Sequence, residues 1–161
     1  MKNPSHRPVD WVEEIMLRQA HKLFRTATVI MKNKADAEDI LQDVFIKLVE
    51  KSPQFESLEH ETAWLVRVTV NFCKSRLRFH WWKKVVPLLE SYPAKTDEEY
   101  DITQAVLALP SNFRIVINLF YYHGYSTREI AALTARKEST VRKDLTRARR
   151  LLKDFLEGEN K

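Results

Sequence analysis

Hydrogen-bond donors and positive charges line one side of a predicted helix near the carboxyl terminus. At about 100° per residue, the members of this row share one helix face: Ser139, Lys143, Thr146, Arg147 and Arg150. Such side chains can donate to phosphate oxygens and to acceptor atoms on base edges. The row predicts a helix that binds nucleic acid, and a solvated basic surface helix is the competing interpretation.

The elements that would position this row favour nucleic-acid binding. The opposite face of the same helix carries apolar residues at helical spacing, which predicts its burial: Val141, Leu145, Ala148 and Leu152. A shorter helix precedes it, and Ser126 followed by Glu129 has the spacing of a capping box. Two such helices with a short break between them, within residues 125–153, predict a helix-turn-helix that reads duplex DNA.

The composition of the whole chain favours an all-α protein. It has 161 residues, of which 44% are apolar and only two are glycine, and strand-like alternation is rare. The formal charge is +5, and basic residues gather late in the chain and in residues 76–84, where they would attract a polyanion. We find no signal peptide and no apolar run near the ~18 residues that span a bilayer. We therefore expect a cytoplasmic protein without stable membrane insertion.

Three amphipathic helices are predicted in the first half, after a polar, flexible segment at residues 1–8. They cover residues 9–31, 37–51 and 61–78, and Asp36 is placed to cap the second. Their apolar residues predict one core: Trp11, Val12, Ile15, Met16, Ala20, Leu23, Phe24, Ala27, Ile40, Leu41, Val44, Phe45, Leu48, Trp64, Leu65, Val68, Phe72 and Leu77. Residues 9–84 are therefore predicted to form the first domain.

The second half begins with a predicted flexible linker at residues 85–96, which contains two prolines and no sustained periodicity. Thr96 followed by Glu99 repeats the capping-box spacing. The predicted elements after it are a helix over residues 97–109, an apolar helix over residues 115–122 that stops at Gly124, and the helix-turn-helix. Together they predict a second domain at residues 97–161. The expected fold is thus all-α, with two small helical domains joined by a linker.

Catalytic chemistry is not predicted. Cys73 is the only cysteine, so neither an internal disulfide nor a cysteine-rich zinc site can form. None of the five histidines has the spacing of metal ligands, and glycine-rich phosphate loops are absent. Without converging acids, bases or nucleophiles, the chain is expected to be neither an enzyme nor a holder of a metal or cofactor.

Five segments carry a resemblance to a known family. They are DAEDILQDVFIKLVE (residues 36–50), AWLVRVTVNFCKSRLR (63–78), ALP (108–110), HGYSTREIAAL (123–133) and STVRKDLTRARRLLK (139–153). The first two are similar to the polymerase-binding and promoter-melting helices of bacterial sigma factors, and the last three to their upstream-box reader. The chain therefore resembles the small two-domain extracytoplasmic-function (ECF) group, which is group IV of the sigma-70 family.

This resemblance implies an alternative sigma factor that directs core RNA polymerase to specific promoters and assists DNA melting. Its partners would be core RNA polymerase, through the beta-prime and beta subunits, promoter DNA in duplex and single-stranded form, and an anti-sigma factor. Upstream-box binding is implied for Arg136, Lys137, Ser139, Thr140, Lys143, Thr146, Arg147 and Arg150. Downstream-box and single-strand binding is implied for His60, Arg67, Asn71, Lys74, Arg76 and Arg78. Polymerase binding is implied for Asp39, Gln42, Asp43 and Lys47.

The chain departs from the family pattern at four positions. Ala135 and Arg136 stand in the turn where the family usually has glycine and an aliphatic residue, and Lys137 replaces the usual small polar cap. Ser75 stands where an aspartate is common in the melting helix. These departures concern the geometry of the turn and the promoter sequence rather than the class of protein.

Several alternatives stay open at this point. A stand-alone helix-turn-helix regulator would bind a twofold-symmetric duplex site as a dimer, without polymerase. A pure interaction module held by a partner is a third class, and it is compatible with a sigma factor that an anti-sigma factor covers. Phe45 fits the inward periodicity, which favours the domain core over a polymerase anchor. For Trp81 and Trp82 we favour closure of the end of the domain over stacking on bases.

Overall fold

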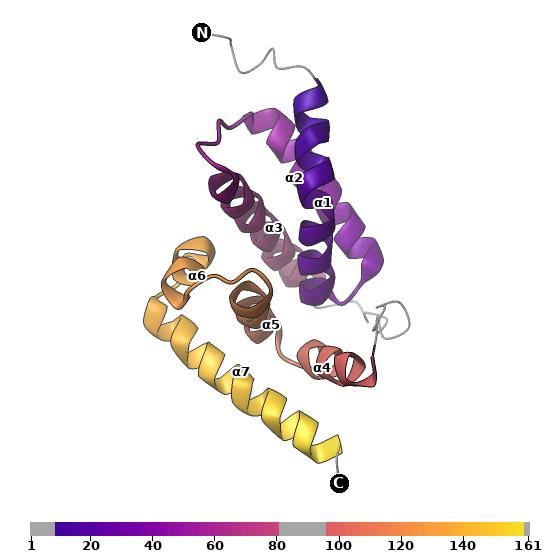
Figure 1. Cartoon of the computed structure of the whole chain (residues 1–161), viewed down its shortest axis with the longest axis vertical. Helices are drawn as coiled ribbons and strands as arrows, with labels where there is room; N and C mark the ends of the chain where they lie inside the picture. Colours follow the sequence, from indigo (N-terminus) through magenta and orange to yellow (C-terminus); the bar gives the residue numbers. More distant parts are fainter. Residues whose placement is uncertain (1–8, 81–95, 160–161) are drawn as a thin grey trace. The chain divides into compact units, whose positions relative to one another are not determined.

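A computed structural model describes residues 9–80 and 96–159, and every regular element in them is helical. The first half contains α1 (Val9–Met31), α2 (Lys34–Lys51) and α3 (Leu58–His80). The second half contains α4 (Asp97–Leu107), α5 (Ser111–Ile117), the π-helical turn η2 (Asn118–Tyr122), α6 (Thr127–Thr134) and α7 (Glu138–Glu159). The described residues contain no strand, so the prediction of an all-α fold is confirmed (Figure 1).

The chain divides into two compact units. The first contains α2, α3 and α1 up to Thr28, and the second contains residues 29–33 together with α4 to α7. The assignment of the last turn of α1 to the second unit was not predicted. Trp81, Trp82 and most of the predicted linker lie outside the described residues.

The core of the first unit follows the predicted periodicity with some exceptions. Among the buried side chains are Ile15, Leu23, Ile40, Val44, Phe45, Leu48, Leu65 and Val68. On α3, however, Trp64, Phe72 and Leu77 are only half-buried, whereas Val66 and Val70 are fully buried. Prediction from a single apolar stripe fails here because α3 buries a wider arc than one stripe. Met16, which was also expected inside, is exposed.

A polar network around the buried residues Gln19 and Glu61 links α1 to the start of α3. The Arg18 guanidinium donates to both carboxylate oxygens of Glu61, over 3.3 and 2.9 Å. The Gln19 amide donates to Glu61 Oε1 over 3.1 Å and to Thr62 Oγ1 over 2.9 Å. The Glu61 hydrogen bond raises the pKa of Arg18. Because Glu61 lies in the first turn of α3, the carboxylate also complements the positive end of the helix dipole.

The predicted cap of the second helix was wrong. Asp36 was expected to cap the second helix, but α2 begins at Lys34, so Asp36 lies within its first turn. Lys32 just before α2 has a φ of 59°, and this left-handed residue separates α1 from α2. In the second unit, Thr96 caps α4 as predicted, since its hydroxyl accepts the Glu99 N–H over 3.1 Å.

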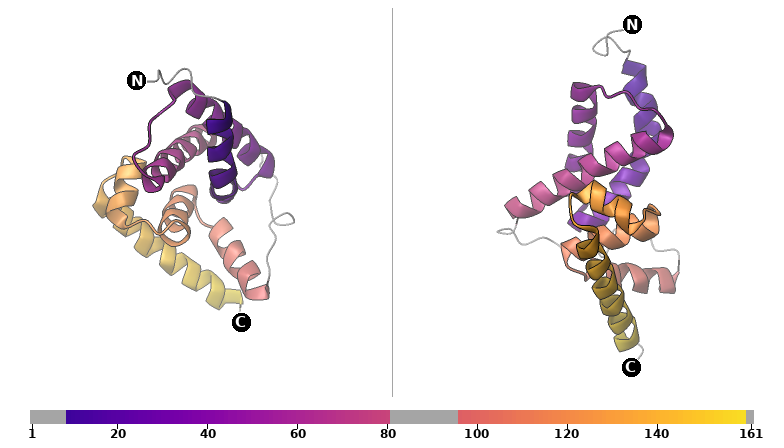
Figure 2. Two further views of the ribbon diagram at one scale, coloured as in Figure 1. Left: turned by 45° about the horizontal axis from the view of Figure 1, so that its top comes forward. Right: turned by 90° about the vertical axis from the view of Figure 1, so that its left-hand side faces the viewer.

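In the second unit α4, α5 and α6 all pack against α7. Figures 1 and 2 show α6 beside the amino-terminal half of α7 and α4 beside its carboxyl-terminal half. Gly124, with a φ of 76°, ends the α5–η2 segment, as predicted for the glycine stop. None of the helices among the described residues has the length and apolar character that a membrane crossing would need.

Candidate nucleic-acid interface

The helix-turn-helix begins with the predicted capping box. The Ser126 hydroxyl accepts the Glu129 N–H and the Glu129 carboxylate accepts the Ser126 N–H, each over 3.1 Å. The two bonds satisfy backbone donors that helix α6 would otherwise leave unpaired. The capping box therefore sets the first residue of α6.

The turn is built without glycine. Ala135 ends α6 in the left-handed region, with φ 53° and ψ 42°. The Arg136 N–H then donates back to the Ala131 carbonyl over 3.0 Å, in the manner of a Schellman cap. An alanine in this conformation costs about 1–2 kcal/mol relative to its usual backbone, so neighbouring contacts must hold the turn.

Helix α7 begins immediately after Lys137. The Lys137 carbonyl accepts the Thr140 and Val141 N–H groups, over 3.0 and 3.1 Å, but a lysine side chain has no oxygen with which to cap a helix. The Thr127 hydroxyl donates to Glu138 over 3.2 Å and links the first residues of α6 and α7. The start of α7 is therefore positioned by α6 as well as by its own backbone.

The predicted donor row of α7 is exposed. The exposed residues of this row and of the turn before it are Lys137, Ser139, Lys143, Thr146, Arg147 and Arg150, and Thr140 is half-buried. On the opposite face Val141, Leu145 and Ala148 are buried as predicted, and Leu152 is half-buried. The Thr146 hydroxyl donates to the Arg142 carbonyl over 3.0 Å. The exposed face offers several cations and hydroxyls to a phosphate backbone.

Arg136 differs from the other predicted DNA-binding residues. Its Nη2 atom donates to Asp144 Oδ2, and both charged groups are largely covered. Asp144 lies on the buried side of α7, between Val141 and Leu145 on that face. Sequence analysis missed this contact, although an acidic residue on the apolar stripe of a basic helix was its signal.

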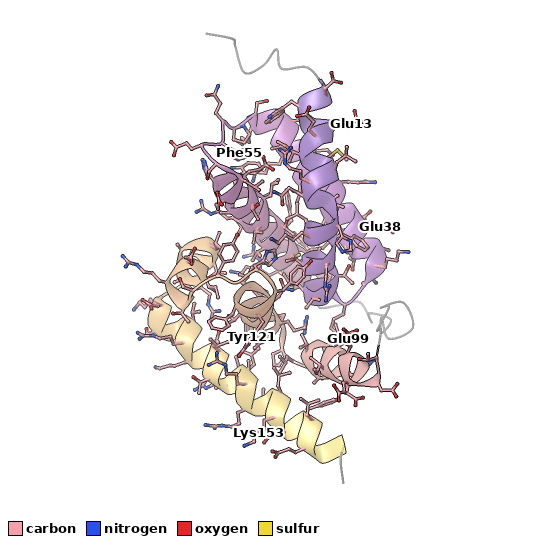
Figure 3. All side chains as sticks on the ribbon, in the orientation of Figure 1. Glu13, Glu38, Phe55, Glu99, Tyr121 and Lys153 are labelled. Carbon is pink, nitrogen blue, oxygen red and sulfur yellow. The ribbon has the colours of Figure 1, made fainter. Side chains whose placement is uncertain are left out.

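Arg149 is a second side chain that the sequence analysis missed. Its Nε donates to the Tyr121 hydroxyl over 2.7 Å, and its guanidinium lies 5.2 Å from the Phe120 ring centroid and 5.6 Å from that of Tyr121. Tyr121, labelled in Figure 3, belongs to η2, and π-helical turns often occur at functional sites. This cation–π contact fixes the middle of α7 to η2.

The predicted polymerase-binding residues share the exposed face of α2. Asp39, Gln42 and Asp43 are exposed, and Lys47 is half-buried with Nζ 5.5 Å from the Phe72 ring centroid. The same face continues with Ile46 and Val49, each 55% exposed. Phe45 is only 7% exposed, in agreement with the core interpretation. The face thus combines an acidic half with an apolar half.

The predicted single-strand-binding residues lie along α3 and before it. Arg67, Asn71 and Arg78 are exposed, whereas Lys74 and Arg76 are half-buried. The Arg76 side chain extends from α3 to two carboxylates of α2. Its Nη2 lies 3.0 Å from Asp39 Oδ2, and its Nε lies 3.6 Å from Asp36 Oδ1. Arg76 therefore contacts a predicted polymerase-binding residue.

His60 is exposed and belongs to an aromatic cluster at the start of α3. Its Nδ1 accepts the Glu56 N–H over 3.2 Å, and its ring meets Phe55 edge-on at 5.4 Å. Phe55 also contacts Trp64, with ring centroids 5.8 Å apart. The cluster orders the loop between α2 and α3.

Two observations on the described residues bear on chemical reactivity. Burial raises the pKa of the Cys73 thiol to about 12, so it stays protonated near neutral pH. No group of three or more His, Cys, Asp or Glu residues within residues 9–80 and 96–159 is arranged to hold a metal ion.

Fold and surface together define a two-unit helical protein with a helix-turn-helix. Its sequence matches Sigma-70 region 2 over residues 15–83 and Sigma-70 region 4 over residues 100–152. The chain belongs to the sigma-70 family, and within it to the extracytoplasmic-function sigma factors. It is an alternative sigma factor, and a stand-alone helix-turn-helix regulator is not favoured.

Named relatives support this assignment. The chain is 28% identical over 157 residues to the ECF RNA polymerase sigma factor SigE of Mycolicibacterium smegmatis, covering 89% of this chain and 61% of SigE. It is 28% identical over 149 residues to SigM of Mycobacterium tuberculosis, covering 89% of this chain and 76% of SigM. These relatives are sigma factors rather than enzymes.

Solved structures agree in fold. The sigma factor RpoE of Bartonella quintana, solved with the anti-sigma factor NepR, has a TM-score of 0.76 and 25% identity, over 92% of this chain and 97% of RpoE. CnrH, solved with the cytosolic domain of CnrY, has a TM-score of 0.67 at 20% identity, over 96% of this chain and 93% of CnrH. The second likeness concerns the fold alone.

Proposed function

We propose that this chain is a group IV sigma factor that binds core RNA polymerase, brings it to specific promoters and assists strand opening in the cytoplasm. The observation that carries the proposal is that one chain joins a Sigma-70 region 2 to a region 4 whose α7 exposes a basic, hydroxyl-rich face. The chain itself catalyses no reaction, and the polymerase supplies the chemistry.

Upstream promoter recognition is assigned to α7. Lys143 and Arg147 are one helical turn apart and both exposed, so one helix face presents them together. A recognition helix lies in the major groove with its amino-terminal residues at the base edges. Ser139 would then approach base edges, and Lys143 and the later arginines would contact phosphates.

Polymerase binding is assigned to the exposed face of α2. Asp39 and Asp43 would meet basic residues on a polymerase helix, which favours orientation and fast association. Ile46 and Val49 supply the apolar contact that Phe45 cannot supply, because Phe45 is buried in the core. A few well-buried residues usually contribute most of the affinity at an interface.

Capture of unpaired bases is assigned to α3 and the loop before it. Asn71 is exposed and carries both a donor and an acceptor, and Arg67 lies one turn earlier on the same helix. Unstacking a base costs a few kcal/mol, which stacking and edge hydrogen bonds in a pocket can offset. No hydrolysis is required for opening by capture.

An anti-sigma factor is proposed as the partner that holds the chain inactive. Support comes from RpoE of Bartonella quintana, which is 25% identical to this chain and was solved with the anti-sigma factor NepR. Run-off transcription on genomic fragments tests the main proposal. Core polymerase with this chain should initiate at specific sites that core polymerase alone does not use. Equal products with and without the chain would contradict it.

A further inference from the structure

Asp144 is a buried acid on a helix that would face a polyanion. Its side chain is 7% exposed, and its neighbours on that face of α7, Val141 and Leu145, are buried apolar residues. A carboxylate in such a place is unfavourable unless a cation or hydrogen-bond donors satisfy it. The structure supplies one cation, the Arg136 guanidinium, whose side chain is 24% exposed.

Arg136 lies in the segment between α6 and α7, so its ion pair with Asp144 connects this segment to the second helical turn of α7. This ion pair lies where two features that usually stabilise such a turn are missing. Ala135 adopts a left-handed conformation without being glycine, and Lys137 offers no capping oxygen. The Thr127 hydroxyl also donates to Glu138 over 3.2 Å and adds a polar link between α6 and α7.

We infer that Arg136 is a positioning residue, which holds α7 at its angle to α6 through Asp144, rather than a DNA-contacting residue. The inference rests on the proposed function, because the angle matters through the promoter contacts of α7. An Arg136 that turned to a phosphate would leave Asp144 buried without its cation. The free-energy cost of breaking this buried ion pair is larger than the free energy gained from a solvent-exposed contact with a phosphate.

The test measures how the effect of Arg136→Met depends on Asp144. The full chain is assembled with core polymerase, and promoter affinity is measured over a range of salt concentrations. The DNA probe is a promoter fragment recovered by run-off transcription with the wild-type chain. Arg136→Met is made in the native chain and in the Asp144→Leu background, and Arg147→Met is the matched arginine control.

A positioning role predicts coupling between the two sites. Arg136→Met should lower promoter affinity about tenfold in the native chain and less than about threefold in the Asp144→Leu background. The slope of log K against log salt should not change, whereas Arg147→Met should reduce it by about 0.9. Equal losses in both backgrounds, with a reduced slope, would overturn the inference in favour of a phosphate contact.

Two further results keep the test decisive. If Arg136→Met does not fold, as judged by circular dichroism, folding and promoter binding by the double variant support the inference. If the double variant folds but does not bind, the inference is wrong. Arg136→Gln keeps a donor for Asp144 and should lose less affinity than Arg136→Met, again at an unchanged slope. Absence of promoter binding by the wild-type assembly would instead contradict the proposed function. In that case, the coupling energy between Arg136→Met and Asp144→Leu in urea unfolding of the free chain would still test the ion pair.

Discussion

Arg76 Nη2 lies 3.0 Å from Asp39 Oδ2, and this ion pair joins α3 to α2. Asp36 lies on the other side of the guanidinium, 3.6 Å from Nε. The sequence had suggested Arg76 for promoter DNA and Asp39 for polymerase. In the free chain the two charges instead neutralise each other, although Asp39 remains more than half exposed and accessible to a partner.

The energy of this pair can be measured by a double-mutant cycle with Arg76→Gln and Asp39→Asn. Because both side chains reach solvent, we expect a coupling energy of about 0.2–1 kcal/mol that falls as salt is added. Urea unfolding followed by tryptophan fluorescence suits the cycle, since all four tryptophans lie within the first 84 residues. A coupling that is zero at low salt would mean that the pair does not form in solution.

Lys143 and Arg147 are expected to contact DNA phosphates. Changing both to alanine should weaken promoter binding by the polymerase complex and reduce the salt slope by roughly 0.9 for each lost contact. Titrations of promoter fragments at several salt concentrations measure both quantities. An unchanged slope would show that another face of α7 meets the DNA.

Ala135→Gly should stabilise the second unit. Glycine removes a steric cost of about 1–2 kcal/mol for the left-handed conformation, and its greater freedom in the unfolded chain opposes this by about 0.4–1 kcal/mol. The free energy of unfolding, measured by circular dichroism in urea, should rise. Ala132→Gly is the matched control: it lies inside α6 and should lower stability by about 1 kcal/mol. A loss of stability in both variants would contradict the turn geometry.

Lys137→Ser is expected to separate stability from DNA binding. A serine oxygen can cap α7 and contributes about 1 kcal/mol, and removal of a cation from the positive end of the helix adds about 0.3–1 kcal/mol. If Lys137 also contacts a phosphate, the variant should bind promoters less tightly, with a salt slope smaller by about 0.9. Thermal unfolding and promoter titration measure the two effects. A destabilised variant would count against this start of α7.

Ile46→Glu should weaken binding to core polymerase without unfolding the chain. Ile46 is 55% exposed, so a charge there meets water in the free chain but would lie against an apolar contact in the complex. We expect an affinity loss of about tenfold or more, typical of an interface anchor. Leu17→Glu, on the exposed side of α1, is the control. Equal polymerase binding by both variants would place the docking face elsewhere.

Much of the architecture followed from local patterns. Period 3.6 in the apolar residues predicted the two faces of α7, and the Ser126–Glu129 spacing predicted the start of α6, because both patterns depend on residues within a few turns of one another. The same logic failed for α3, where Val66 and Val70 are buried outside the predicted stripe. The spacing of apolar residues in the sequence shows which face of a helix is apolar. The elements packed around the helix determine how much of its surface is buried.

The sequence by itself determined the helical class, the helix-turn-helix and the basic face of α7, since these depend on short-range spacing. Only the tertiary structure decided which charges are paired. Arg76 reaches an acid 37 residues away, and Arg136 reaches Asp144 across the turn. The family resemblance had implied DNA binding for both arginines, and it gave no information on their charge partners. Charge partners depend on distances in space between residues that can be far apart in the sequence, so the spacing of residues along the chain does not show them.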